Sequence, residues 1–66
     1  MNLYQLQHIQ IIVQEHLRKL QNEFQPIKHF PDSSPYFVTT NAIRRTEEAL
    51  RAVNKAIDEY RQKEAR

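Results

Sequence analysis

Apolar side chains recur at steps of three and four residues along the N-terminal part of the chain. The recurring positions are Leu6, Ile9, Val13, Leu17, Leu20 and Phe24. This spacing lines one face of a 3.6-residue helix. Asn2 and Gln5 have the spacing of a capping box, in which each side chain binds a free backbone N–H at a helix start. The pattern predicts a helix over about residues 2–25, which Pro26 then ends.

The C-terminal half carries three rows of side chains that repeat every seven residues, as is typical of coiled coils. The rows are Ile43, Leu50 and Ile57, then Thr46, Val53 and Tyr60, then Ala42, Ala49 and Ala56. We predict that Thr39 caps this helix, because Val38 and Ile43 could then form the apolar staple found at helix starts. A cap at Thr40 would pair Thr39 with an arginine instead. The second helix is therefore expected over about residues 39–64, after a connection of 26–38.

These two helices predict an all-α fold, an antiparallel two-helix hairpin that forms a single domain over residues 1–66. The alanine row widens the apolar arc of the second helix to roughly half its circumference, more than one neighbouring helix covers. Tyr4 and Ile11 project almost opposite the face of the first helix that carries Leu6 and Val13. We therefore expect two hairpins to pair into a dimeric four-helix bundle. The residues expected to mediate self-association are Tyr4, Ile11, Ala42, Ala49 and Ala56.

Plainer explanations exist for both features, since alanine favours any helix and single apolar side chains are common on surfaces. Chain length supports association, because a chain of 66 residues buries only about 60% of its unfolded surface. The sequence has no cysteine, so disulfides cannot stabilise it. No apolar run is long enough to span a membrane, and the N-terminus lacks signal-peptide features. We expect a cytoplasmic protein without a membrane partner, from a complete small reading frame of the bacterial, plasmid or phage kind.

The sequence offers little support for catalysis or metal binding. His8 and His16 are eight residues apart, and neither has a histidine or acid four residues further on. Ser33 and Ser34 lie in the expected connection without a base beside them. We expect no enzymatic activity, no metal site and no cofactor.

The connection 26–38 concentrates unusual side chains, with all three prolines and three of the six aromatic rings of the chain. It exceeds the ~2–8 residues that commonly join helices in bundles, and such long links tend to be functional. One hypothesis makes its apolar residues a plug over the end of the bundle. The other makes Phe30, Tyr36 and Phe37 a docking surface with a basic rim. From their positions in the sequence, we expect Ile27 and Phe37 to be plugs and Phe30 and Tyr36, each next to a proline, to dock a partner.

The net charge is only +2, but the excess of bases lies in residues 18–45. The bases there are Arg18, Lys19, Lys28, Arg44 and Arg45. If the second helix begins at residue 39, Arg44 and Arg45 lie in its first turns, where the helix dipole disfavours cations. Glu48 or Glu23 could neutralise them, or a bound anion could.

Binding is therefore the predicted role. The first hypothesis is a non-enzymatic protein–protein interaction module, either an adaptor or a regulatory protein, which contacts its partner through Phe30, Tyr36, Lys28, Arg44 and Arg45. The alternative is RNA or DNA binding by the basic end of the hairpin. In size and layout the chain resembles the small plasmid copy-number proteins, which are dimeric helical hairpins that bind RNA. That resemblance is one of architecture, and the two share no motif.

Overall fold

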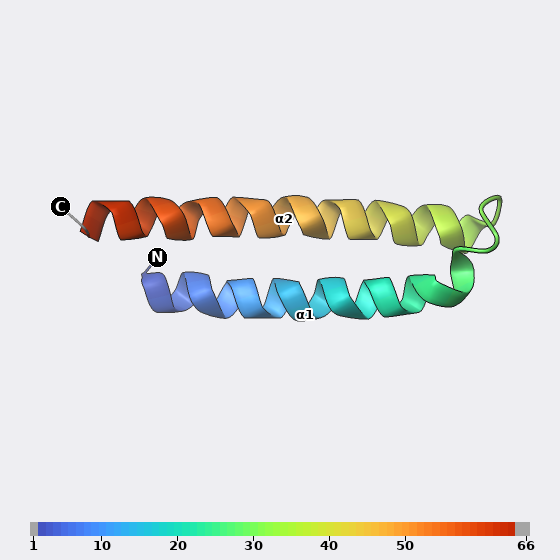
Figure 1. Ribbon diagram of the computed structural model, residues 1–66, viewed down its shortest axis with the longest axis horizontal. Coiled ribbons are helices and arrows are strands. Elements are labelled where there is room, and N and C mark those ends of the chain that lie inside the picture. Colours follow the sequence, from blue (N-terminus) through green and yellow to red (C-terminus); the bar gives the residue numbers. More distant parts are fainter. Residues whose placement is uncertain (1, 65–66) are drawn as a thin grey trace.

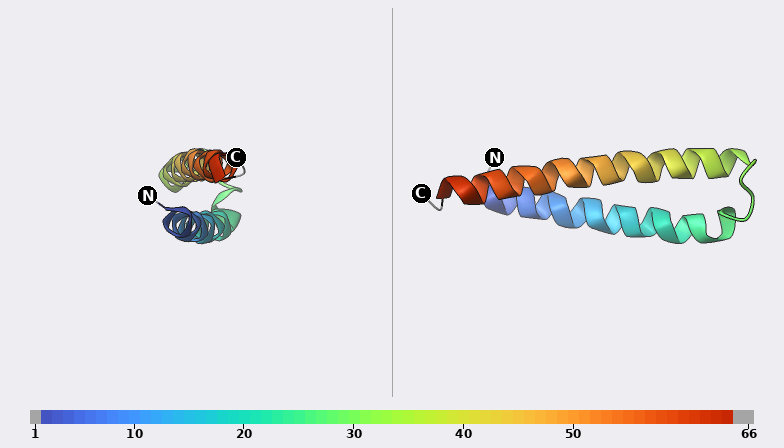
Figure 2. Two further views of the ribbon diagram at one scale, coloured as in Figure 1. Left: turned by 90° about the vertical axis from the view of Figure 1, so that its left-hand side faces the viewer. Right: turned by 45° about the horizontal axis from the view of Figure 1, so that its top comes forward.

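The computed structural model describes residues 2–64 and contains two long helices joined by a short bend. Helix α1 spans Leu3–Ile27 and α2 spans Ser34–Glu64. They lie side by side and antiparallel, so that both ends of the chain are at the same end of the molecule (Figure 1). The two helices form a single layer (Figure 2), and the molecule measures 51 × 15 × 14 Å. The predicted all-α hairpin is confirmed.

Helix α1 begins with the predicted capping box. Asn2 Oδ1 accepts a hydrogen bond from the backbone N–H of Gln5 at 2.9 Å, and Gln5 Oε1 accepts one from the N–H of Asn2 at 3.0 Å. The C-terminal end differs from the prediction, because the helix continues through Pro26 to Ile27. Lys28 still donates its backbone N–H to Phe24 O at 2.9 Å. Proline has no N–H for the carbonyl four residues before it, which accounts for the curved last turn in Figure 1.

Helix α2 begins at Ser34, so the prediction of a start at Thr39 is wrong. The side chain of Ser33 caps the helix, since its Oγ accepts the backbone N–H of Tyr36 at 3.3 Å. Pro35 fits into the first turn, where backbone N–H groups have no partner within the helix. Thr40 lies inside the helix, and its hydroxyl is 2.8 Å from Tyr36 O. Ser-Ser-Pro was the local signal for the true start.

The link between the helices is correspondingly short, and the predicted connection 26–38 is wrong. It consists of the six residues 28–33, which lies within the usual range of about 2–8. Its backbone is folded into consecutive turns, with Phe30 N–H donating to Ile27 O at 2.9 Å and Ser33 N–H to Phe30 O at 3.1 Å. The length of the link therefore no longer indicates a functional loop.

The two helices meet along a line of partly buried side chains that we call the seam. From α1 the seam takes Leu3, Leu6, Gln10, Val13, Leu17, Leu20, Phe24 and Ile27, and from α2 it takes Tyr36, Thr39, Ile43, Thr46, Leu50, Val53, Ile57 and Tyr60. The first two seven-residue rows of the sequence thus face α1, as their spacing indicated. Within residues 2–64 only Ile57, at 3% exposed, and Thr46, at 9%, are classed as buried. The hairpin has a thin core.

Neither helix contains a stretch that is both long and apolar enough to cross a membrane, as far as residues 2–64 are concerned.

Candidate interaction surface

Two broad faces flank the seam, one on each side of the hairpin. In an antiparallel pair, a residue that precedes a seam residue in one helix lies on the same side of the hairpin as a residue that precedes a seam residue in the other helix. Ile9, which precedes Gln10 in α1, and Ala42, which precedes Ile43 in α2, therefore lie on one side. We call this side the isoleucine–alanine face. Its apolar residues are Ile9, Ile12, Val38, Ala42, Ala49, Ala52 and Ala56, and its polar ones are His16, Lys19, Glu23, Arg45 and Glu59. The opposite side is the glutamine face. Its flank along the seam is polar, with Gln7, Gln14, Gln21, Glu47 and Asn54, and its outer part carries Tyr4, Ile11 and Phe37. The two faces therefore differ in polarity.

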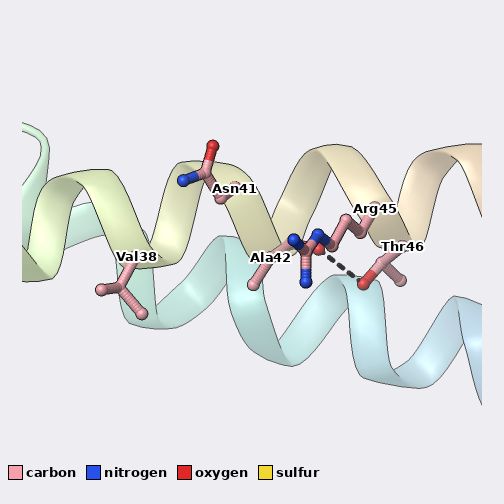
Figure 3. A pocket seen from close by; sticks show the side chains of 5 residues that line it. All are labelled: Val38, Asn41, Ala42, Arg45 and Thr46. Atoms are coloured by element: carbon pink, nitrogen blue, oxygen red, sulfur yellow. Dashed lines mark hydrogen bonds between the residues drawn. The ribbon is translucent and has the colours of Figure 1, made fainter.

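A groove opens on the isoleucine–alanine face near the bend (Figure 3). Val38, Ala42 and Thr46 lie on the side of α2 nearer α1, whereas Asn41 points away from it. The guanidinium of Arg45 lies between Ala42 and Thr46. Thr46 donates its hydroxyl to Ala42 O at 2.7 Å, so this buried polar group is satisfied within its own helix. The groove therefore has apolar walls and a single charged side chain.

The glutamine face carries a polar contact between the helices. Gln10 Nε2 donates to Asn54 Oδ1 at 2.6 Å, and this bond is partly buried. Nearby, a second groove is lined by Leu17, Glu47, Leu50, Arg51 and Asn54. Sequence reasoning missed the Gln10–Asn54 pair because it assigned Ile9, and not Gln10, to the face that meets the second helix. Gln10 also has the right spacing from Leu6 and Val13, which was the available signal.

The residues predicted for self-association lie on two different sides of the hairpin. Ala42 and Ala56 are half-buried beside the seam, and Ala49 is exposed between them. Tyr4 and Ile11 are exposed on the outer side of α1. Helical spacing places Ile11 next to Gln7 and Gln14, toward the glutamine face. The five residues therefore do not form one continuous surface.

The aromatic rings near the bend differ from the prediction in which of them are buried and which are exposed. Tyr36 is half-buried in the seam, and its ring packs against Phe24 with centroids 5.2 Å apart. Phe37 touches Tyr36 edge-on, with a centroid distance of 5.9 Å, but remains 57% exposed. Phe30 is 66% exposed, and Ile27 is half-buried at the end of α1. In the hairpin, Tyr36 therefore covers the core, whereas Phe37, the predicted plug, is a surface residue.

The predicted basic site is mostly exposed and partly engaged with neighbouring amides. Lys28 Nζ donates to Gln25 Oε1 at 3.0 Å, and Arg44 Nη2 donates to Asn41 Oδ1 at 3.1 Å. Arg44 and Arg45 share a surface notch with Glu48 and Asn41. Because α2 begins at Ser34, both arginines lie about three turns inside the helix, beyond the reach of its terminal dipole. The reason for expecting a bound anion beside them is therefore removed.

The other predicted bases, Arg18 and Lys19, lie exposed in the C-terminal half of α1. No group of three or more His, Asp or Glu side chains within residues 2–64 is arranged to hold a metal ion. Comparison of the chain with protein-family models, curated proteins and solved structures found no match.

Proposed function

We propose that this chain is a small, non-enzymatic protein–protein interaction module, an adaptor or regulatory protein of the cytoplasm, that self-associates through its helices as a dimeric four-helix bundle. The observation that supports this proposal is the excess surface of one hairpin. The hairpin exposes 5434 Å². A compact protein of its mass, 8.0 kDa, is expected to expose about 4,450 Å².

This difference of roughly 1,000 Å² is close to the ~800 Å² that each partner buries in a stable interface. Much of the surplus is apolar, because several large side chains remain in water. They are Tyr4, Ile11, Ile12, Phe30, Phe37 and Val38. Burial of part of this surface between two copies adds the hydrophobic free energy that the thin seam lacks.

Partner binding is proposed at the bend end of the hairpin. Phe30 provides an exposed ring and Tyr36 a half-buried one, and Lys28, Arg44 and Arg45 are proposed as the polar rim. Aromatic and arginine side chains are enriched among the residues that dominate binding free energies. Phe37 extends this surface, since it is 57% exposed and its ring contacts that of Tyr36.

Light scattering and sedimentation of the full chain across a dilution series test the proposal. We expect a mass of two chains at micromolar concentration and a thermal unfolding midpoint that falls on dilution, since association stabilises the folded state by mass action. A mass of one chain at high concentration, with a midpoint that ignores dilution, would refute self-association.

Nucleic-acid binding is the weaker candidate, since its main structural premise, cations at a helix start, is not met. A titration with RNA and with DNA at several salt concentrations separates it from the proposal. Neutralisation of phosphates gives affinities that drop steeply between about 50 and 200 mM salt. Such a dependence would favour the alternative.

A further inference from the structure

The two broad faces differ in the free energy that is needed to remove them from water. Gln7, Gln14 and Gln21 each carry an amide that needs hydrogen-bond partners once buried. On the other face, Ile9, Ile12, Val38 and the alanines carry no polar side-chain atom. Arg45 and Lys19 lie on this face too, but their long side chains can keep the charged ends in water at the rim of an interface. Covering the isoleucine–alanine face is therefore the less costly choice.

The dimensions of the hairpin indicate what can cover that face. A rectangle of 51 by 15 Å has an area of roughly 770 Å², close to the ~800 Å² per partner of a standard interface. Only a partner that lies along the whole hairpin can use this area. A second copy has the same length and width and carries the same apolar face, so a two-fold axis would bury both faces together.

We infer that the isoleucine–alanine face is the surface buried against a second copy of this chain, while the glutamine face remains in water. This inference rests on the self-association proposed above and adds which side of the hairpin mediates it. It also separates the predicted self-association residues, since Ala42, Ala49 and Ala56 belong to the interface and Tyr4 and Ile11 do not.

Two neighbouring residues of α1 provide a matched test. Ile11 and Ile12 are both 52% exposed, so a single hairpin buries the two side chains to the same extent. Adjacent residues point about 100° apart around a helix. Ile12 lies beside Ile9, one turn earlier, on the isoleucine–alanine side, whereas Ile11 lies beside Gln7 and Gln14.

The experiment compares the full chain with Ile12→Glu and Ile11→Glu by sedimentation equilibrium at several loading concentrations. Glutamate favours helices at least as well as isoleucine does, so circular dichroism should report unchanged helicity for both. For Ile12→Glu we expect the dimer dissociation constant to rise about tenfold or more, because a charged carboxylate would be removed from water in the interface. For Ile11→Glu we expect a change within about threefold, as for an exposed position.

A second pair of variants tests the same inference if Ile12→Glu loses helicity. Ala49→Glu and Gln14→Glu each add one carboxylate at a position that is exposed in the hairpin, but on opposite faces. Only Ala49→Glu should weaken the dimer. A dimer that is equally sensitive on both faces, or more sensitive at Ile11 and Gln14, would overturn the assignment of the face and leave self-association intact. A monomeric unmodified chain would overturn both.

Discussion

The half of the hairpin next to the bend and the half at the open end are held together by different interactions. Near the bend, the rings of Phe24 and Tyr36 pack at a tilt and Ser33 caps α2, but none of the seam residues from Leu20 to Ile43 is fully buried. The open half contains Ile57, the most buried apolar side chain within residues 2–64, and the Gln10–Asn54 hydrogen bond. The most buried apolar side chain therefore lies far from the covalent link, whereas Thr46, the other buried residue, lies near the middle of the hairpin.

This difference has an explanation in chain entropy. Residues on either side of a six-residue link are held close together even in a loosely folded chain, so little free energy is needed to keep them in contact. Segments at the open end are separated by most of the chain, and their contacts must offset a larger loss of entropy. Close packing and a specific hydrogen bond are thus most valuable at the open end.

The largest expected effect is that of Ile57→Ala. Removal of this buried side chain should lower the free energy of unfolding by ~2–5 kcal/mol, as for other large-to-alanine changes in cores. Ile43→Ala is the matched control, since Ile43 is a half-buried isoleucine of the same row nearer the bend. Denaturant unfolding at one fixed protein concentration measures both. Equal losses would mean that the two halves are equally well packed.

A smaller effect is expected from the ring that packs at the bend end. Tyr36→Ala removes the packing against Phe24 and should cost about 1–2 kcal/mol, less than the ~3–5 of a fully buried ring. The neighbouring Phe37→Ala should change stability by no more than ~0.5 kcal/mol, because that ring is exposed. Thermal unfolding of both variants compares the two adjacent rings. The reverse order would restore Phe37 as the plug and leave Tyr36 free for docking.

The polar pair in the open half can be examined by a double-mutant cycle. Gln10→Leu alone should cost about 1 kcal/mol, since Asn54 is left partly buried without its partner. Gln10→Leu together with Asn54→Leu should recover this loss, because an apolar pair needs no hydrogen bond. Chemical denaturation gives the coupling free energy. A coupling of zero would show that the 2.6 Å hydrogen bond is too solvated to stabilise the open half.

The smallest change is expected from replacing Arg44 and Arg45 together with glutamine. With α2 starting at Ser34, stability should stay within about 0.5 kcal/mol, as for surface positions generally. The slight gain expected for cations at a helix start should be absent. The same variant tests the nucleic-acid alternative, for which the salt slope of binding would fall by about one for each phosphate that the arginines no longer neutralise. Circular dichroism melts and a salt titration provide the measurements.

The sequence predicted the parts of the fold that depend on periodic spacing. The rows through Ile43 and Thr46 meet α1 because a seven-residue repeat keeps side chains on one side of a helix whatever the details of the bend. The capping box at Asn2 could also be predicted from the sequence, since it is formed entirely by neighbouring residues. Local and periodic signals therefore sufficed for the hairpin.

The helix boundaries at the prolines were predicted wrongly, because the effect of a proline depends on its position within a helix. The sequence pattern assigns Pro35 to a loop, but in a first turn a missing N–H costs nothing. Because of this one misinterpretation, the predicted start of the second helix lies too far along the chain and the predicted link is too long. The same misinterpretation also misplaces Arg44 and Arg45 relative to the helix end. The positions of Tyr36 and Phe37 depend on that start too, so their roles could not be assigned from sequence.

The bend is made without glycine, and none of residues 2–64 has a positive φ angle. Every backbone conformation along this part of the chain is thus one that any amino acid except proline can adopt freely. Positions such as His29 and Asp32 are consequently open to a wide range of substitutions, limited by surface contacts and not by backbone geometry. Mutational drift can therefore change the charge and shape of this tip while the hairpin keeps its alignment, which makes the bend the part of the molecule best suited to acquire new binding specificity.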